Sequence, residues 1–321
     1  MTLTAQKKSA LQIFDYLFVL RPMLFYPGWS TMLAGFFVAR DDELFLSPAM
    51  ISGLDHLLVL KLFVLFGAAM GASFLLNQLQ DIESDLKNKK LFIISENYIS
   101  NKAAIVEIVV LVAVSILISF GISFAVGLLA TAFLIVTGYL YNFRPFNLKN
   151  HPWGSLAANS MMGWLAFALG WGAVRGLDPG LILDSVPYVF FNTALYFFTT
   201  LPDMDGDRQC RKHTLAVIYG FGKILNAAFV LYIVSLAVAL IIMDLQALIF
   251  IVLSFPFFIY MMKERTIESA IRTTKYGILF FAMAVCLRLP YYFVIMLSGF
   301  FFTKWYFKKR FQYDYPNFKG N

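Results

Sequence analysis

Apolar runs of about 20 residues recur along almost the whole sequence and are separated by short polar stretches. A helix of that length crosses the roughly 30 Å hydrocarbon core of a bilayer and satisfies its own backbone hydrogen bonds there. Only 14% of the 321 residues are charged, and the mean hydropathy is +0.72, whereas about a quarter of the residues are charged in a soluble domain. The sequence therefore predicts an all-α polytopic membrane protein with a single domain over residues 1–321.

We expect about nine transmembrane helices, with a short polar tail before them and a basic tail after them. Their predicted limits are near 22–39, 57–77, 103–120, 122–142, 153–173, 186–202, 225–243, 246–262 and 277–302. If the N-terminus is cytoplasmic, most of the 26 Lys and Arg residues fall in loops on that side, as the positive-inside rule requires. Topology thus accounts for the net charge of +7, and no nucleic-acid partner is indicated.

The basic tail at residues 304–320 departs from this topology. An odd number of spans places it on the side opposite the other basic segments. Either the rule is weak at the end of the chain or the prediction miscounts a span.

Two acidic segments follow apolar runs, and both fall on the predicted cytoplasmic side. In "NQLQDIESD", Asn77, Asp81 and Asp85 are spaced i, i+4, i+8 and share one stripe of a helix. In "DMDGD", Asp203 and Asp207 are again i, i+4. Like charges at this spacing repel, and a carboxylate at mid-bilayer costs about 2.5–3.5 kcal/mol. We therefore expect these groups at the interface or in a water-filled cavity, beside counter-charges.

Carboxylate and amide oxygens are the ligands that Mg²⁺ prefers, and Mg²⁺ commonly links carboxylates to substrate phosphates. Two such helix ends on one side of the membrane can hold Mg²⁺ around one diphosphate. Neighbouring basic residues are candidates for direct phosphate contacts: Lys87, Lys89, Lys90, Arg208, Arg211 and Lys212. The alternatives are that the acidic groups are ordinary solvated helix ends and that the basic ones only mark topology.

These residues resemble the motifs of the UbiA superfamily of intramembrane prenyltransferases. Asn77, Asp81 and Asp85 fit its N-x-x-x-D-x-x-x-D motif, and Asp203 and Asp207 fit its D-x-x-x-D motif. Between the two, "YLYNFRPFNLKN" is similar to the family's Y-S-x-x-P … L-K segment, with matches at Tyr141, Pro145 and Lys149. "LRP" at Arg21 resembles the start of the family's first helix.

The resemblance implies a bundle around a central cavity and an integral membrane enzyme with its active site on the cytoplasmic side. It implies Mg²⁺-dependent transfer of a prenyl group from a polyprenyl diphosphate to a lipophilic or membrane-associated acceptor, with release of diphosphate. The implied metal ligands are Asn77, Asp81, Asp85, Asp203 and Asp207, with Asp205 as a further candidate. The implied catalytic groups are Asp81, Asp85, Asp203 and Asp207. The implied diphosphate-binding residues are Lys149, Tyr141, Arg21 and Arg208.

The sequence departs from the family pattern at a few positions. Gln78 stands where Asp is common, Lys89 and Lys90 replace an Arg-Pro pair, and His213 differs from the usual residue. These departures bear on the number of metal ions and on the diphosphate contacts. The acceptor stays open among quinone-precursor aromatics, carotenoids, chlorophyllides and lipids.

Two other classes of protein place acidic residues near a membrane. A Mg²⁺-dependent CDP-alcohol phosphotransferase needs one continuous D-G-x-x-A-R cluster, which this sequence lacks. An ion-coupled transporter places its acids near mid-span, in broken helices, rather than at span ends. Both readings explain the two separated motifs less well than a prenyltransferase does.

Overall fold

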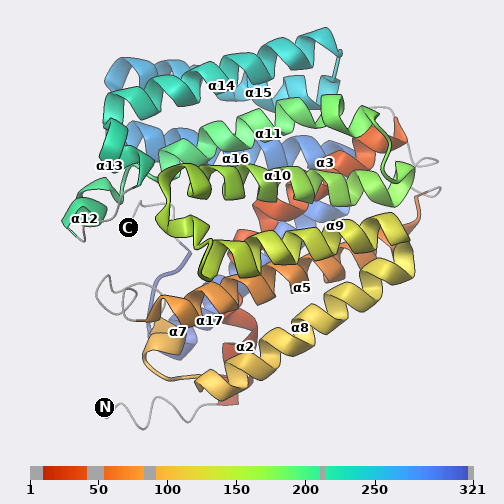
Figure 1. The fold of residues 1–321 in the computed structure, drawn as a ribbon, viewed down its shortest axis with the longest axis vertical. Coiled ribbons are helices and arrows are strands. Elements are labelled where there is room, and N and C mark those ends of the chain that lie inside the picture. The colour runs from red at the N-terminus through yellow and green to blue at the C-terminus, as the bar shows by residue number, and fades with distance from the viewer. Residues whose placement is uncertain (1–9, 42–53, 83–91, 210–213, 317–321) are drawn as a thin grey trace.

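The computed structural model of the protein describes residues 10–41, 54–82, 92–209 and 214–316, and all regular elements in these ranges are helical (Figure 1). The long helices are α3 (Phe25–Arg40), α5 (His56–Gln80), α8 (Asn101–Ile122), α9 (Phe124–Leu134), α10 (Pro152–Arg175), α11 (Gly180–Thr199), α14 (Phe221–Ile241), α15 (Leu245–Glu264), α16 (Ile267–Arg288) and α17 (Pro290–Phe311). The short ones are η1 (Ala10–Phe14), α2 (Asp15–Phe18), η2 (Pro22–Leu24), α7 (Phe92–Ser95), the π-helix η3 (Ile135–Leu140), η4 (Leu148–Asn150), α12 (Met204–Gln209) and α13 (Leu215–Tyr219). The predicted all-α class is confirmed.

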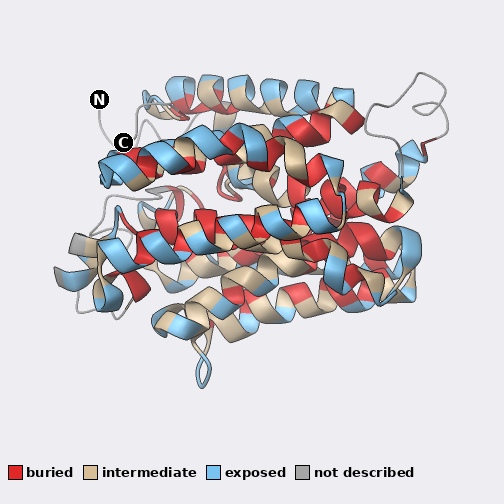
Figure 2. Cartoon of the chain, turned by 90° about the horizontal axis from the view of Figure 1, so that it is seen from above, coloured by how far each residue is buried: buried red, intermediate tan, exposed pale blue. Residues whose placement is uncertain are grey.

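The long helices form a membrane-type bundle. Within the described residues, six of them are long and apolar enough to span a bilayer: α5, α8, α11, α14, α15 and α16. Buried residues face the inside of the bundle, and exposed residues lie on its outer faces (Figure 2). On α8 the exposed positions include Val106 and Leu117, whose exposed fractions are 63% and 73%. Such an apolar exterior is suited to contact with lipid chains.

Glycine residues allow α3 and α10 to pack closely near the middle of the bundle (Figure 1). Gly35 lies against the backbone carbonyl of Phe167, and Gly170 lies against that of Met32. A Cβ atom at either glycine would overlap the facing carbonyl oxygen. Membrane helices commonly approach through small residues, because lipid provides no hydrophobic force that drives them together.

The predicted last span at 277–302 is wrong, because two helices cover these residues. Helix α16 ends at Arg288, and α17 begins at Pro290. Proline lacks a backbone N–H and disfavours helical geometry in the residue before it, so it starts a new helix here. The Arg288 guanidinium donates from Nη1 to Phe37 O (3.1 Å) near the end of α3, whereas Tyr292 Oη donates to Tyr26 O (2.9 Å) near its start.

Helix α17 therefore runs from the start of α3 back past η2 and η1, and the basic C-terminal tail returns to the end of the bundle that holds the N-terminal segment (Figure 1). The reversal of the chain between α16 and α17 thus explains why the tail departed from the predicted topology.

A buried ion pair joins the two ends of the chain; we call Asp15, Tyr306 and Arg310 the N–C clasp. The Asp15 carboxylate accepts from Tyr306 Oη (2.6 Å), Arg310 Nε (3.0 Å) and Arg310 Nη2 (2.9 Å). The side chains of Asp15 and Arg310 are 0% and 1% exposed. The Arg310 guanidinium also lies 5.3 Å from the ring centre of Tyr98, between α7 and α8. The clasp fixes three segments of the chain at one end of the bundle.

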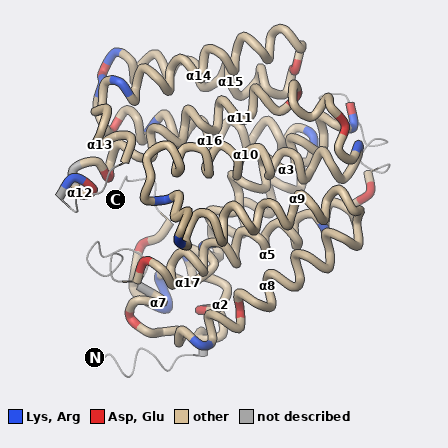
Figure 3. Tube along the Cα trace, viewed as in Figure 1, with Lys and Arg blue, Asp and Glu red and all other residues tan. Residues whose placement is uncertain are grey.

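Charged residues gather mainly at the two ends of the bundle (Figure 3). We call the end at which α5, α11 and α17 finish and α10, α14 and α16 begin the site end, because both acidic segments of the sequence lie there. The structure thus places the ends of the two predicted acidic helices on the same side.

Candidate functional site

The last turn of α5 carries the first two residues of the predicted acidic motif. Asp81 follows Gln80 directly, and its backbone N–H donates to Asn77 O (3.0 Å), so the two side chains lie one turn apart. The apolar run of α5 ends here at the membrane boundary. A carboxylate at a helix C-terminus is unfavourable beside the negative end of the helix dipole. A cation is therefore favourable at this position.

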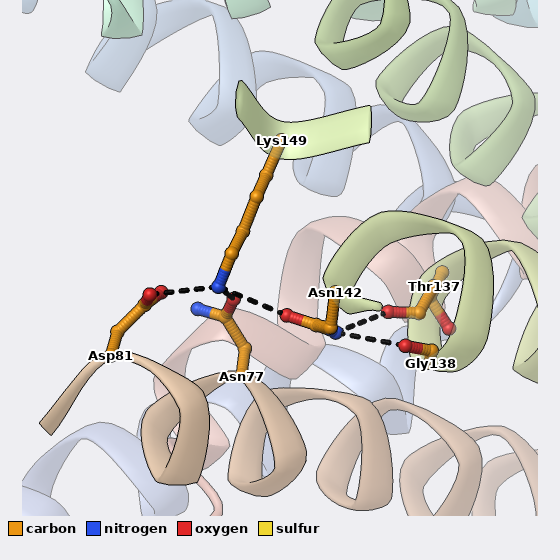
Figure 4. A network of polar contacts seen from close by, with 6 residues as sticks. All are labelled: Asn77, Asp81, Thr137, Gly138, Asn142 and Lys149. Atoms are coloured by element: carbon orange, nitrogen blue, oxygen red, sulfur yellow. Dashed lines mark hydrogen bonds and ion pairs between the residues drawn. The ribbon is translucent and has the colours of Figure 1, made fainter. Parts of the chain in front are cut away.

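Lys149 supplies that cation from a separate segment, the short helix η4. Its Nζ donates to Asp81 Oδ1 (2.7 Å), Asn142 Oδ1 (3.3 Å) and Asn77 Oδ1 (3.4 Å), as Figure 4 shows. The Lys149 side chain is 14% exposed and that of Asp81 is 29% exposed. We call Asn77, Asp81, Asn142 and Lys149 the lysine cradle. It brings three predicted site residues together, and it leaves them partly open to solvent.

Asn142 is the cradle residue that the sequence analysis did not assign to the site. It lies just beyond the π-helix η3, is 6% exposed, and donates from Nδ2 to Thr137 O (3.1 Å) and Gly138 O (3.0 Å). These bonds satisfy carbonyls of the irregular turn and aim Asn142 Oδ1 at Lys149 (Figure 4). A π-turn within an apolar helix often marks a functional site. In the sequence, the available signal for this role was an Asn at the end of an apolar run, seven residues before Lys149.

Gln78 points away from the lysine cradle, although it stands where the family commonly has a carboxylate. It is 3% exposed and donates from Nε2 to Val19 O (2.8 Å) and Phe74 O (3.3 Å). The amide therefore ties the end of α5 to the segment that carries Arg21. Val19 O accepts a hydrogen bond there, which an ionised carboxylate cannot donate.

Arg21 and Tyr141, two predicted diphosphate-binding residues, lie at the site end. Arg21 has a left-handed backbone (φ 59°), which turns the chain into η2. Tyr141 immediately precedes Asn142, and its hydroxyl interacts with Ser155 and Asn159. The charge of Asp81 acts on the same hydroxyl. Tyr141 therefore lies close to the lysine cradle without being part of it.

The second acidic segment forms the short helix α12 at the same end of the bundle (Figure 1). The Asp207 N–H donates to Asp203 O (2.8 Å), which stacks the two residues at i, i+4 as predicted. Asp203 and Arg208 are exposed, and Asp207 is half-buried.

Part of the predicted metal set lies outside the described residues. This is true of Asp85 and of the side chain of Asp205, as it is of Lys87, Lys89, Lys90, Arg211, Lys212 and His213. Within the described part, no group of three or more His, Cys, Asp or Glu side chains is close enough to hold a metal ion. The two-helix metal site therefore stays a prediction.

The oxygen atoms of the lysine cradle nevertheless suit a hard cation as ligands. One carboxylate and two amide oxygens converge on the Lys149 ammonium group. Mg²⁺ takes the same oxygen ligands and is usually held by only one or two carboxylates, with its remaining positions filled by water or phosphate. The residues present thus fit a cation that is completed by a phosphate-bearing ligand.

The fold of the chain is similar to several solved structures. A UbiA homologue from Archaeoglobus fulgidus superimposes with a TM-score of 0.68 at 19% identity, over 88% of this chain and 99% of that one. The same homologue bound to GPP and Mg²⁺ gives a TM-score of 0.63 at 18% identity, over 88% and 99%. A digeranylgeranylglyceryl phosphate synthase gives a TM-score of 0.63 at 19% identity, over 85% and 98%. A search of curated proteins finds no significant match.

Family membership follows from the sequence over most of the chain. The profile of the UbiA prenyltransferase family matches residues 28–275, from α3 into α16. That range includes both acidic segments and the lysine cradle. The chain is an integral, multi-pass membrane protein and a transferase of prenyl groups, and it belongs to the UbiA prenyltransferase family.

Proposed function

We propose that this chain transfers a prenyl group from a polyprenyl diphosphate to a lipophilic or membrane-associated acceptor and releases diphosphate. The observation that carries the proposal is the contact of Lys149 with Asp81 and Asn77 at the end of α5. In a UbiA-family chain, this contact gathers a cation and oxygen ligands where a diphosphate would bind. The homologue from Archaeoglobus fulgidus bound to GPP and Mg²⁺ supports the same class of donor and metal.

Five residues are proposed to hold Mg²⁺: Asn77, Asp81, Asp85, Asp203 and Asp207, with Asp205 as a peripheral ligand. The four Asp residues of this set other than Asp205 are proposed as the catalytic residues. Mg²⁺ bound there would neutralise the negative charge that develops on the departing diphosphate. Asp203 directly precedes α12 and lies one turn from Asp207, which supports a shared role because equal charges at this spacing repel.

Lys149 is proposed to bind the diphosphate directly. Its ammonium group neutralises Asp81 in the described state and can donate to phosphate oxygens from the same position. Tyr141, Arg21 and Arg208 are proposed as further donors, because Tyr141 lies near Asp81 and all three belong to segments at the site end. These donors would favour the departure of the diphosphate as the allylic C–O bond breaks.

The membrane location suits this reaction. A polyprenyl chain is apolar along its length, and a helical bundle within the bilayer can take it up without exposing it to water. The basic residues that follow the two acidic segments in the sequence support a cytoplasmic active site by the positive-inside rule. The acceptor is proposed as a quinone-precursor aromatic, a carotenoid, a chlorophyllide or a lipid.

The test is turnover of the purified protein in lipid nanodiscs with a labelled polyprenyl diphosphate. Bound lipids extracted from the protein and identified by mass spectrometry supply the candidate acceptors. We expect Mg²⁺-dependent release of diphosphate, abolished by EDTA. Asp81→Asn and Asp203→Asn should each lower kcat/KM by about 10²- to 10³-fold.

Asp55→Asn is the matched control, because Asp55 caps the opposite end of the same helix α5 through Leu58 N (2.9 Å). Asn caps helices as well as Asp does, so this variant should retain full turnover. Full activity in both site variants would overturn the assignment of the metal-binding residues. Turnover that is unaffected by EDTA would overturn the role of Mg²⁺.

A further inference from the structure

A groove of about 620 Å³ lies on the outside of the bundle, between α15 and α16. Helices α14 and α15 form the edge of the bundle furthest from α8 (Figure 1). The groove is lined by Phe257 and Tyr260 from α15 and by Arg272, Lys275, Tyr276 and Leu279 from α16. None of these residues belongs to the lysine cradle or to the acidic segments. The groove is therefore separate from the proposed active site.

Stacked aromatic rings line one side of the groove. The rings of Phe257 and Tyr276 stack with centroids 4.3 Å apart and planes at 23°. Thr273 Oγ1 donates to Phe257 O (3.0 Å), which holds α16 against α15 at this level. Tyr260 and Tyr276 are each 41% exposed, so their rings and hydroxyls are accessible from the lipid side. Tyrosine in this setting is typical of the membrane interface, where one end of the side chain is apolar and the other is wet.

Two basic side chains line the same groove, one turn apart on α16. Helix α16 begins at Ile267 at the site end, so Arg272 and Lys275 lie about 8 and 12 Å along it at 1.5 Å per residue. Helical side chains lean toward the N-terminus, and long basic side chains extend toward the headgroups. Their charges therefore lie in the half of α16 that is nearer the site end, on the side of one leaflet.

Only part of the Arg272 guanidinium is engaged by the protein. Its Nη2 donates to Glu268 Oε1 (2.6 Å) in an i, i+4 pair whose side chains are 54% and 74% exposed. An exposed pair of this kind contributes little to stability. The guanidinium has five N–H donors in a planar fork, which suits a phosphate better than a single carboxylate contact does.

We propose that this groove binds one anionic phospholipid from the leaflet that faces the site end. The lipid phosphate lies between Arg272 and Lys275, the glycerol and headgroup contact Tyr260 and Tyr276, and an acyl chain follows Leu279 toward mid-bilayer. Basic pockets between transmembrane helices bind acidic headgroups in this way, whereas a zwitterionic lipid offers no net charge for the two cations. The charge and the apolar lower wall together favour a lipid over a free phosphate ion.

The experiment counts the lipids retained by the full-length protein in native mass spectrometry. The protein is released from nanodiscs in which phosphatidylglycerol replaces phosphatidylcholine in graded amounts. Each basic residue near a membrane surface strengthens binding of an acidic lipid about fivefold. We expect the wild type to retain phosphatidylglycerol preferentially. Arg272→Gln with Lys275→Gln should weaken that binding about 25-fold.

Lys223→Gln with Lys263→Gln is the matched control. It removes two exposed basic residues at the same end of the bundle, outside the groove, and should leave retention unchanged. Tyr276→Ala keeps both charges and removes the aromatic wall, so it should also reduce retention.

Three outcomes would overturn the proposal. One is equal retention of the two lipids by the wild type. The second is an equal loss in the groove variant and the control variant, which would indicate general attraction to the membrane. The third is a groove variant that keeps the lipid but loses binding of the prenyl diphosphate, which would assign the groove to the donor substrate.

Discussion

Two ion pairs lie at the site end of the bundle, and they differ sharply in burial. In the N–C clasp, the side chains of Asp15 and Arg310 are 0% and 1% exposed, and the carboxylate accepts three hydrogen bonds. In the lysine cradle, the exposed fractions of Lys149 and Asp81 are 14% and 29%. Lys149 makes one short contact, to Asp81, and two longer ones to amide oxygens.

The two pairs differ in whether their charges are accessible to a ligand: those of the clasp are fully buried, and those of the cradle are partly exposed. A carboxylate without access to solvent cannot exchange its partner for a metal or a phosphate, because each step would leave a charge buried and unpaired. A half-open pair can exchange partners, because water and the incoming ligand compensate each charge in turn. The clasp therefore holds the end of the bundle together, whereas we propose that the cradle binds substrate.

The largest expected effect comes from breaking the clasp on one side only. Asp15→Asn leaves Arg310 buried and uncompensated, and it should lower the free energy of unfolding by about 3–5 kcal/mol. Chemical unfolding in detergent, followed by tryptophan fluorescence, measures this change. The double variant Asp15→Leu with Arg310→Met removes both charges and should be much closer to the wild type.

The control for the clasp is Asp314→Asn. It breaks the exposed pair of Asp314 with Lys304 (3.4 Å) and should change stability by less than about 1 kcal/mol. If Asp15→Asn costs no more than Asp314→Asn, the clasp does not hold the bundle together.

A substitution in the lysine cradle should lower enzymatic activity and leave the stability of the fold almost unchanged. Lys149→Gln removes a donor that we assign to the departing diphosphate, so kcat/KM should fall by about 10²- to 10³-fold. Because Asp81 is partly exposed, the free energy of unfolding should change by less than about 1 kcal/mol. Steady-state turnover and detergent unfolding of one preparation test both statements. Arg144→Gln, an exposed basic residue in the same connecting segment, should leave both quantities unchanged.

A smaller effect is expected at Gln78, where the family commonly has a carboxylate. Gln78→Asp should not raise affinity for Mg²⁺, because the side chain faces Val19 O and not the cradle. It should lower the free energy of unfolding by about 1–3 kcal/mol through a lost buried hydrogen bond. Gln80→Asp, at an exposed position of the same helix, should stay within about 0.5 kcal/mol of the wild type. A tighter Mg²⁺ site in Gln78→Asp, measured by titration, would contradict the observed orientation of Gln78.

Much of the fold follows from the sequence, because a bilayer imposes length and polarity on each span. The predicted span 57–77 corresponds to α5 at His56–Gln80, and 225–243 corresponds to α14 at Phe221–Ile241. The last span failed because the apolar run continues through the break between α16 and α17. Pro290 was the signal for that break, and the polar Arg288 just before it was mistaken for a residue within a span.

The site was predictable only in part, and the reason is separation along the chain. Spacing alone placed Asn77 and Asp81 on one stripe of α5, since helix periodicity is local. The contact of Lys149 with Asp81 joins residues 68 positions apart, and that of Gln78 with Val19 joins residues 59 apart. Resemblance to a family indicated Lys149, but only tertiary packing reveals that Asn142 orients it and that Gln78 faces away.

The clasp also has a consequence in time. Asp15 and Arg310 are 295 residues apart, so a ribosome that adds about 5–20 residues per second makes the second about 15–60 s after the first. During that interval the Asp15 carboxylate is without its partner and stays hydrated at the membrane surface. This buried ion pair can therefore form only after synthesis is almost complete, when the last helix docks.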